Sequence, residues 1–157
     1  DGAIFETLVA DHDRHRALLD KVEATVGDSP ERAALFEELT LELKAHAAAE
    51  EQALWSSILR KPPVTEDARH AVAEHKSIDD MLNDLAATDM ATGGWLIKFR
   101  GLKDEYLHHI KEEEEEQFPA SAAHLDDADK QWMQKVFKER KKAEKAKAEV
   151  TPEKMDG

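Results

Sequence analysis

Residues 43–55 read LKAHAAAEEQALW, and in this stretch His46 and Glu50 stand four positions apart. The same pairing recurs downstream as His109 and Glu113. Because an α-helix completes one turn in about 3.6 residues, residues four apart lie on the same helix face. Each pair therefore presents an imidazole and a carboxylate from one helix toward a common core, an arrangement that helix bundles use to hold metal ions.

Outward from these pairs, apolar residues recur at steps of three and four, and this periodicity predicts five helices. Their expected ranges are 4–26, 30–60, 65–87, 93–119 and a fifth that begins after residue 127. The apolar stripe of the first helix is expected to extend to Val26, and that of the third to include Val72. Each of the first four stripes also contains one histidine: His12, His46, His75 and His109.

The spacing of these histidines indicates two copies of one helical hairpin. His12 and His46 are 34 residues apart, as are His75 and His109, and the two halves are related by an offset of 63. The same offset aligns the glutamates of the two pairs. Two repeated hairpins with short joints favour an up-down-up-down bundle in which all four histidines reach the same level.

The expected fold is therefore all-α. An antiparallel up-down-up-down four-helix bundle is predicted over residues 1–125, followed by an additional C-terminal helix and a frayed, solvated, charged tail over residues 126–157. In this last helix Trp132, Val136 and Phe137 pack either against the bundle or against another subunit. We expect a monomer or a weak homodimer.

Six side chains of the predicted core fit a metal centre. They are His12, His46, Glu50, His75, His109 and Glu113. Buried groups of this kind are unfavourable unless they are paired or bound to a metal. They fit two metal ions bridged by both glutamates and an oxo or hydroxo group, with at least one open position for a small ligand. The sequence has no cysteine, and imidazole and carboxylate accept iron, manganese and zinc. The alternative is a set of hydrogen-bonded core histidines and solvated glutamates.

Four segments resemble the helices of the hemerythrin-like HHE cation-binding domain family, over residues 4–119. They are VADHDRHRALL at 9–19, LKAHAAAEEQALW at 43–55, AEHKSIDDML at 73–82 and HHIKEEEEEQFP at 108–119. The resemblance implies a non-haem centre of two iron ions, held by the same six residues, that binds or reacts with oxygen, nitric oxide or peroxide. Ala71 stands where hemerythrins carry a second histidine one turn before the third-helix ligand. Bacterial proteins that repair iron centres are similar around His12 and His46 but add a histidine near Ala33.

The hairpin repeat fails at two informative positions, because His15 aligns with Ile78 and Leu43 aligns with Tyr106. Both His15 and Tyr106 are expected on the side of the metals opposite the glutamates. We hypothesise that one of them supplies a further ligand or hydrogen-bonds a species in the open position. In the alternative, Tyr106 packs as a core aromatic and His15 bonds to it or to a carboxylate.

Other polar residues are expected in supporting or surface roles. Glu51 and Glu114 are expected to accept hydrogen bonds from the ligand histidines of neighbouring helices. The remaining histidines, His70, His108 and His124, are expected at the surface.

Composition narrows the function. With 35 acidic and 22 basic residues, the net charge of -13 disfavours binding to nucleic acid and anionic membranes. No stretch has the roughly 20 apolar residues that span a bilayer, and the first residues do not form an export signal, so we expect a cytoplasmic protein. The leading interpretation is a protein that binds oxygen or nitric oxide for sensing, storage or detoxification. The alternatives are a peroxide-reacting redox enzyme and an iron-handling or iron-centre repair protein, and no catalytic residue is identified.

Overall fold

The computed structural model describes the backbone of residues 3–156 and the side chains of residues 3–148. Within that range every regular element is a helix, and there is no strand. The elements are α1 (Ala3–Glu23), α2 (Pro30–Glu50), η1 (Glu51–Trp55), α3 (Ser56–Ile58), η2 (Pro62–Val64), α4 (Thr65–Ala86), α5 (Gly93–Glu112), η3 (Glu113–Gln117), α6 (Phe118–Ala122) and α7 (Asp127–Asp156). Of the η elements, η1 and η3 are π-helical and η2 is a 3-10 helix.

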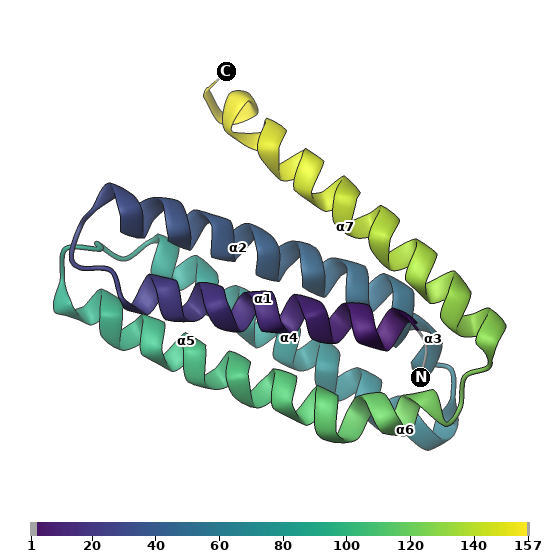
Figure 1. The fold of residues 1–157 in the computed structure, drawn as a ribbon. Coiled ribbons are helices and arrows are strands. Elements are labelled where there is room, and N and C mark those ends of the chain that lie inside the picture. The colour runs from purple at the N-terminus through teal and green to yellow at the C-terminus, as the bar shows by residue number, and fades with distance from the viewer. Residues whose placement is uncertain (1–2, 157) are drawn as a thin grey trace.

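Four long helices form an antiparallel bundle (Figure 1). Helix α1 packs against α2 and α5, and α4 packs against α5 and α2. Between α1 and α2 the chain turns at Gly27, which has a φ of 58°. The Ser29 side chain then accepts a hydrogen bond of 3.1 Å from the backbone N–H of Arg32, so that Ser29 caps α2 and Pro30 takes its first turn. The predicted up-down-up-down bundle is confirmed.

Two valines lie outside the apolar stripes in which they were expected. Helix α1 ends at Glu23, and Val26 is 83% exposed in the connection that follows. On α4, Ala71 is fully buried and Val72 is 40% exposed, although steps of three and four from Ala68 to His75 can pass through either residue. The prediction that Val26 and Val72 belong to the core is therefore wrong.

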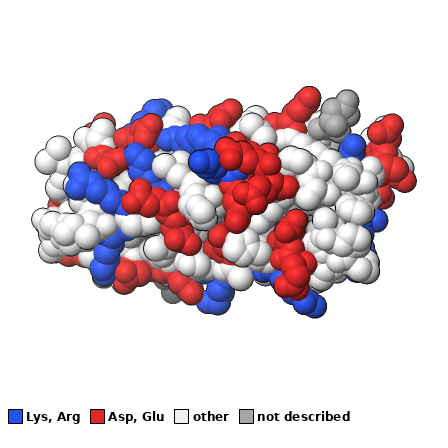
Figure 2. Space-filling view, turned by 90° about the horizontal axis from the view of Figure 1, so that it is seen from below, with Lys and Arg blue, Asp and Glu red and all other residues white. Residues whose placement is uncertain are grey.

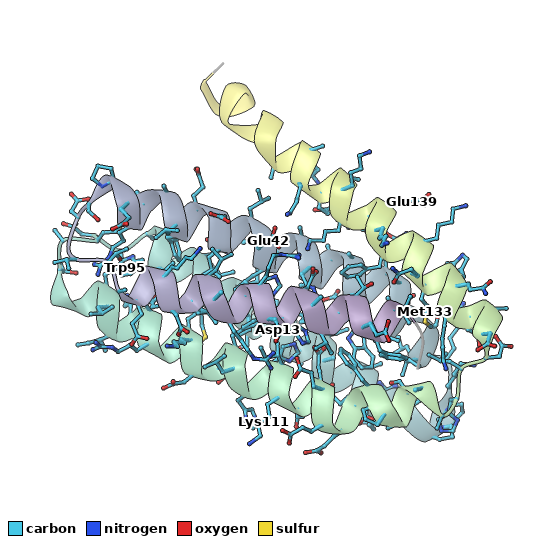
Figure 3. All side chains as sticks on the ribbon, viewed as in Figure 1. Asp13, Glu42, Trp95, Lys111, Met133 and Glu139 are labelled. Carbon is cyan, nitrogen blue, oxygen red and sulfur yellow. The ribbon has the colours of Figure 1, made fainter. Side chains whose placement is uncertain are left out.

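The bundle core consists of two apolar clusters with a polar layer between them. One cluster contains Trp55 and Phe118 and includes Met133 of α7. The other contains Trp95 and Phe99. Figure 3 shows Trp95 and Met133 toward opposite ends of the molecule. On α1, α2 and α4 a buried histidine separates the residues of one cluster from those of the other, and at the end of α5 the buried Glu113 of η3 does so, so the polar layer crosses the four-helix bundle.

Helix α7 packs across the hairpin formed by α1 and α2 (Figure 1). Met133 and Phe137 are buried there, and Val136 is partly buried. Trp132 is 50% exposed. Of the two expected arrangements, packing against the bundle is thus observed for Val136 and Phe137. The charged segment 138–148 is helical, and the fraying expected at the end of the tail falls on residues whose side chains lie outside the described part.

The described surface is strongly charged. Acidic and basic side chains share the face in Figure 2, where acidic side chains gather near the middle. In the run of glutamates from 112 to 116, only Glu113 is buried, and its neighbours are partly or fully exposed. Across residues 3–156, every helix is too short or too polar to pass through a membrane.

Candidate metal centre

In the polar layer, the Nε2 atoms of four histidines face the carboxylates of two glutamates. The Nε2–O distances are 3.2 Å for His12 and 3.4 Å for His109 to Glu113, and 3.3 Å for His46 and 3.0 Å for His75 to Glu50. All six residues are at most 7% exposed. The six residues predicted as ligands therefore meet in one layer of the bundle.

The six side chains form two overlapping groups. Ligand atoms lie within 4.8 Å of one another in the group Glu50, His75, His109 and Glu113, and also in the group His12, His46 and Glu50. Each glutamate faces one histidine from each helical hairpin, and Glu50 belongs to both groups. The geometry thus offers two neighbouring cation positions that share a carboxylate, as in two-metal sites.

The atoms that face the middle of this layer lack hydrogen-bond partners. They are Nε2 of His12, His46 and His75, Oε2 of Glu50, and both carboxylate oxygens of Glu113. A buried polar atom without a partner costs about 1–3 kcal/mol, and native cores keep few of them. Two metal ions would satisfy these atoms together, and imidazole with carboxylate is a donor set that iron, manganese and zinc accept. The residues present therefore fit a pair of metal ions.

The other ring nitrogen of each histidine is held by a carboxylate. The Nδ1–O pairs are His12–Glu114 at 2.7 Å, His46–Asp11 at 2.8 Å, His75–Glu51 at 2.7 Å and His109–Glu74 at 2.7 Å. A donated Nδ1–H fixes the tautomer that leaves the Nε2 lone pair free for a metal. The carboxylates thus hold all four rings in a metal-binding orientation.

The sequence predicted Glu51 and Glu114 as acceptors for the ligand histidines, but it did not predict Asp11 and Glu74, which have the same role. The missed residues obey the hairpin repeat, since positions 11 and 74 differ by 63. Each also stands immediately before the histidine of its own helix, where its side chain points toward a neighbouring helix. An acidic residue at both repeat-related positions was the signal that identifies them.

A π-helical turn accompanies the glutamate in both repeats. Element η1 begins directly after Glu50, and η3 begins at Glu113 itself. Residues five apart diverge on an α-helix, but the wider π turn brings them onto one face. Trp55 accordingly donates its Nε1–H to Glu50 Oε1 at 2.9 Å. Neither turn was expected from the sequence, and the first one positions a carboxylate of the layer.

Burial and ion pairing set the protonation of the metal-free layer. Burial and the nearby Glu50 carboxylate raise the pKa of Glu113 well above its usual range. Burial also acts to raise the pKa of Glu50, but His46 and His75 outweigh it and hold that pKa well below the usual range. Burial acts to lower the pKa of His75, yet the nearby carboxylates of Glu50 and Glu51 raise it to about 9. His75 therefore carries a proton at neutral pH, and Glu113 keeps its proton to a higher pH than an ordinary glutamate does.

We expect metal affinity to rise between about pH 7 and pH 9. A metal ion must displace the proton of His75, whose raised pKa is about 9, so each pH unit below that value weakens binding by about tenfold. Above the pKa this dependence ends. Co²⁺ titrations of the metal-free protein across this pH range give the affinity, and the acid released into a weak buffer gives the displaced protons. An affinity that does not change with pH contradicts the expectation.

His15 and Tyr106 form a buried pair beside the histidine layer. The His15 Nδ1 and the Tyr106 hydroxyl are 2.6 Å apart, and His15 Nε2 lies 3.4 Å from Glu42 Oε1. Glu42 extends from α2 (Figure 3) and pairs with Lys141 and Lys145 of α7. Burial lowers the pKa of His15 to about 4 and raises that of Tyr106 well above its usual range. Both rings are therefore neutral at pH 7, and in this structure His15 is hydrogen-bonded to Tyr106.

A small cavity opens next to this pair. It measures about 20 Å³ and is bounded by His46, His75 and Tyr106. Its remaining inner walls are the apolar residues Leu43, Ile78 and Leu82. At its rim, Lys44 and Asp79 form an ion pair of 3.2 Å between α2 and α4. The volume is enough for one small molecule.

The other three histidines lie at the surface, as expected. His108 and His124 are exposed. The His70 side chain is 49% exposed, and its Nε2 lies 2.8 Å from Glu112 and 3.2 Å from Glu74. Glu74 is also the carboxylate that holds His109, so it links the surface His70 to the histidine layer.

An all-helical bundle whose core gathers histidines and glutamates that could hold metal is a metal-binding helical domain. The chain belongs to the hemerythrin HHE cation binding domain family, whose model matches residues 3–121. The resemblance expected from the sequence is thus confirmed. No curated protein matches this chain.

A solved structure extends the similarity beyond the bundle. The crystal structure of a hemerythrin HHE cation binding domain-containing protein from Mycobacterium kansasii is similar to this chain, with a TM-score of 0.81 and 26% sequence identity. The match covers 94% of this chain and 90% of that chain. Because 94% is more than residues 3–121, the similarity includes part of α7.

Proposed function

We propose that this protein is a non-haem di-iron protein that binds a small diatomic ligand, oxygen or nitric oxide. The proposed iron ligands are His12, His46, Glu50, His75, His109 and Glu113, with the two glutamates bridging the ions. Bound iron would supply two adjacent Lewis acids that change oxidation state. The family binds cations, and histidine with carboxylate suits iron.

The small cavity is the observation that carries this proposal. His46 and His75, one from each hairpin, form part of its wall. A ligand that enters it therefore lies against one histidine of each cation position. Leu43, Ile78 and Leu82 make the pocket apolar, and its volume of about 20 Å³ excludes larger molecules. Both properties suit a neutral diatomic molecule.

Metal analysis with absorption spectra tests the proposal. We expect about two iron ions per chain, oxo-to-iron bands, and a spectral change when oxygen or nitric oxide is added to the reduced protein. Ile78→Phe fills the cavity and is expected to abolish the response to the gases without changing the iron content. Fewer than about 1.5 iron ions per chain, or no response to either gas, contradicts the proposal.

A chain of buried polar side chains favours reaction with peroxide as a second candidate function. The neutral His15 accepts a hydrogen bond from the Tyr106 hydroxyl at its Nδ1, and its Nε2–H then faces the Glu42 carboxylate at 3.4 Å. The chain thus leads from the cavity to Lys145 on α7. Two molecules of hydrogen peroxide give two of water and one of oxygen, which requires protons to move between oxygen atoms. Reversible binding of a gas requires no such chain.

We expect Tyr106→Phe to slow oxygen release from peroxide by about 100-fold, because it removes the hydroxyl at the inner end of the chain. The iron content should stay at the wild-type value. An oxygen electrode measures the rate, and Glu42→Gln, which keeps the shape of the chain, should give a smaller loss. An unchanged rate contradicts the relay. Loss of a strong visible band in Tyr106→Phe would instead identify Tyr106 as an iron ligand.

A further inference from the structure

The two cation positions have the same ligand pattern but different surroundings. We call the position beside His12 and His46 the α1–α2 position, and the position beside His75 and His109 the α4–α5 position. The hairpin repeat relates their ligands and also the carboxylates that accept the Nδ1–H bonds. The cationic partners of those carboxylates do not follow the repeat.

At the α1–α2 position, both supporting carboxylates carry permanent cations. Arg16 lies 2.9 Å from Glu114. Lys141 of α7 lies 2.8 Å from Asp11, the carboxylate that holds His46, and Arg14 pairs with the other oxygen of Asp11. The negative charges behind this pair of histidines are therefore neutralised.

At the α4–α5 position, the supporting carboxylates have weaker partners. Among the residues that the structure describes, neither Glu51 nor Glu74 pairs with a lysine or an arginine. Within the described part of the chain, the ion partners of Glu74 are His109 and the half-exposed His70. The carboxylates behind this second pair of histidines keep more of their negative charge.

Lys141 is fixed in place by the packing of α7. Phe137, one helical turn earlier, packs edge-on against the His46 ring with the centroids 5.6 Å apart. Lys141 itself is only 12% exposed and also lies 3.2 Å from Glu42. Since α7 packs on the α1–α2 hairpin, its Lys141 and Lys145 pair with Asp11 and Glu42 of that hairpin. Lys141 also lies beyond residues 3–121, the part that matches the family.

We propose that Lys141 is a positioning residue that makes the two metal ions inequivalent, by neutralising Asp11 behind His46 and so weakening cation binding at the α1–α2 position. The proposal rests on the two-metal centre proposed above. A carboxylate that already pairs with a cation is a poorer acceptor, so the imidazole it holds donates less electron density to a metal. The ammonium group also repels the metal cation. The α4–α5 position consequently fills first.

Stepwise titration of the metal-free protein with Co²⁺, followed by its visible absorption, tests this inference. The wild-type protein is expected to bind two ions in two separate steps. Lys141→Met is expected to tighten the weaker step by about tenfold and to leave the stronger step unchanged. This direction distinguishes the proposal from damage to the fold, because a loosened site binds both ions more weakly.

Three variants complete the experiment. Lys141→Arg, which keeps the charge, and Lys142→Met, which removes an exposed lysine of the same helix, should both behave like the wild type. In a His12→Gln background, which disables the α1–α2 position, Lys141→Met should leave the remaining step unchanged. If Lys141→Met binds two ions and the affinity of its weaker step is unchanged or lower than in the wild type, the inference is overturned but the metal centre is not. Fewer than two ions in the wild type overturn both.

Discussion

Replacing Glu113 by glutamine is expected to weaken the binding of both metal ions, whereas replacing His12 by glutamine is expected to weaken the binding of only one. Glu113 faces His12 of one hairpin and His109 of the other, so its carboxylate serves both cation positions. His12 faces only one of them. Since changes next to a metal ligand already cost about 10–100-fold in affinity, loss of a ligand should cost more than about 100-fold for each ion that it serves.

Metal content at a free metal concentration about ten times the wild-type dissociation constant measures this difference. We expect almost no metal in Glu113→Gln and one ion per chain in His12→Gln. Glu115→Gln, an exposed neighbour on the same run of glutamates, is the control and should keep two ions. If Glu113→Gln keeps one ion at the wild-type affinity, Glu113 does not bridge.

Removing the metal is expected to lower the melting temperature by about 15–30 °C. A ligand present at 1,000 times its dissociation constant stabilises the folded state by about 4 kcal/mol, so two such ions contribute about 8 kcal/mol. For a domain of this size, each kcal/mol corresponds to about 2–4 °C. The metal-free layer also leaves buried nitrogen and oxygen atoms without partners.

Calorimetric scans of the metal-loaded and the chelator-treated protein measure this shift, and adding metal back should restore the higher temperature. Glu113→Gln, which is expected to bind little metal, serves as the matched control, because its melting temperature should not respond to chelator. Melting temperatures that agree within a few degrees with and without metal would mean that the histidine layer is satisfied without ions.

Much of the polar layer could be predicted because it follows from local periodicity. A histidine and a glutamate four apart share a helix face whatever the neighbouring helix does, which is why His46 and Glu50 were expected to point inward. The prediction failed where periodicity was ambiguous, as at Val72, which lies one position from the buried Ala71. It also missed the π-helical turns, since their cost is offset by contacts such as the bond from Trp55 to Glu50.

The sequence by itself determined the helical bundle, its hairpin repeat and the set of side chains that share the core layer, because steps of three and four residues fix which faces are buried. Only the tertiary structure decided how that layer is completed. Glu50 lies between His46 and His75, and Asp11 lies beneath Lys141, a contact between residues 130 positions apart. Such pairings depend on how helices pack against one another, and periodicity within a single helix carries no information about packing between helices.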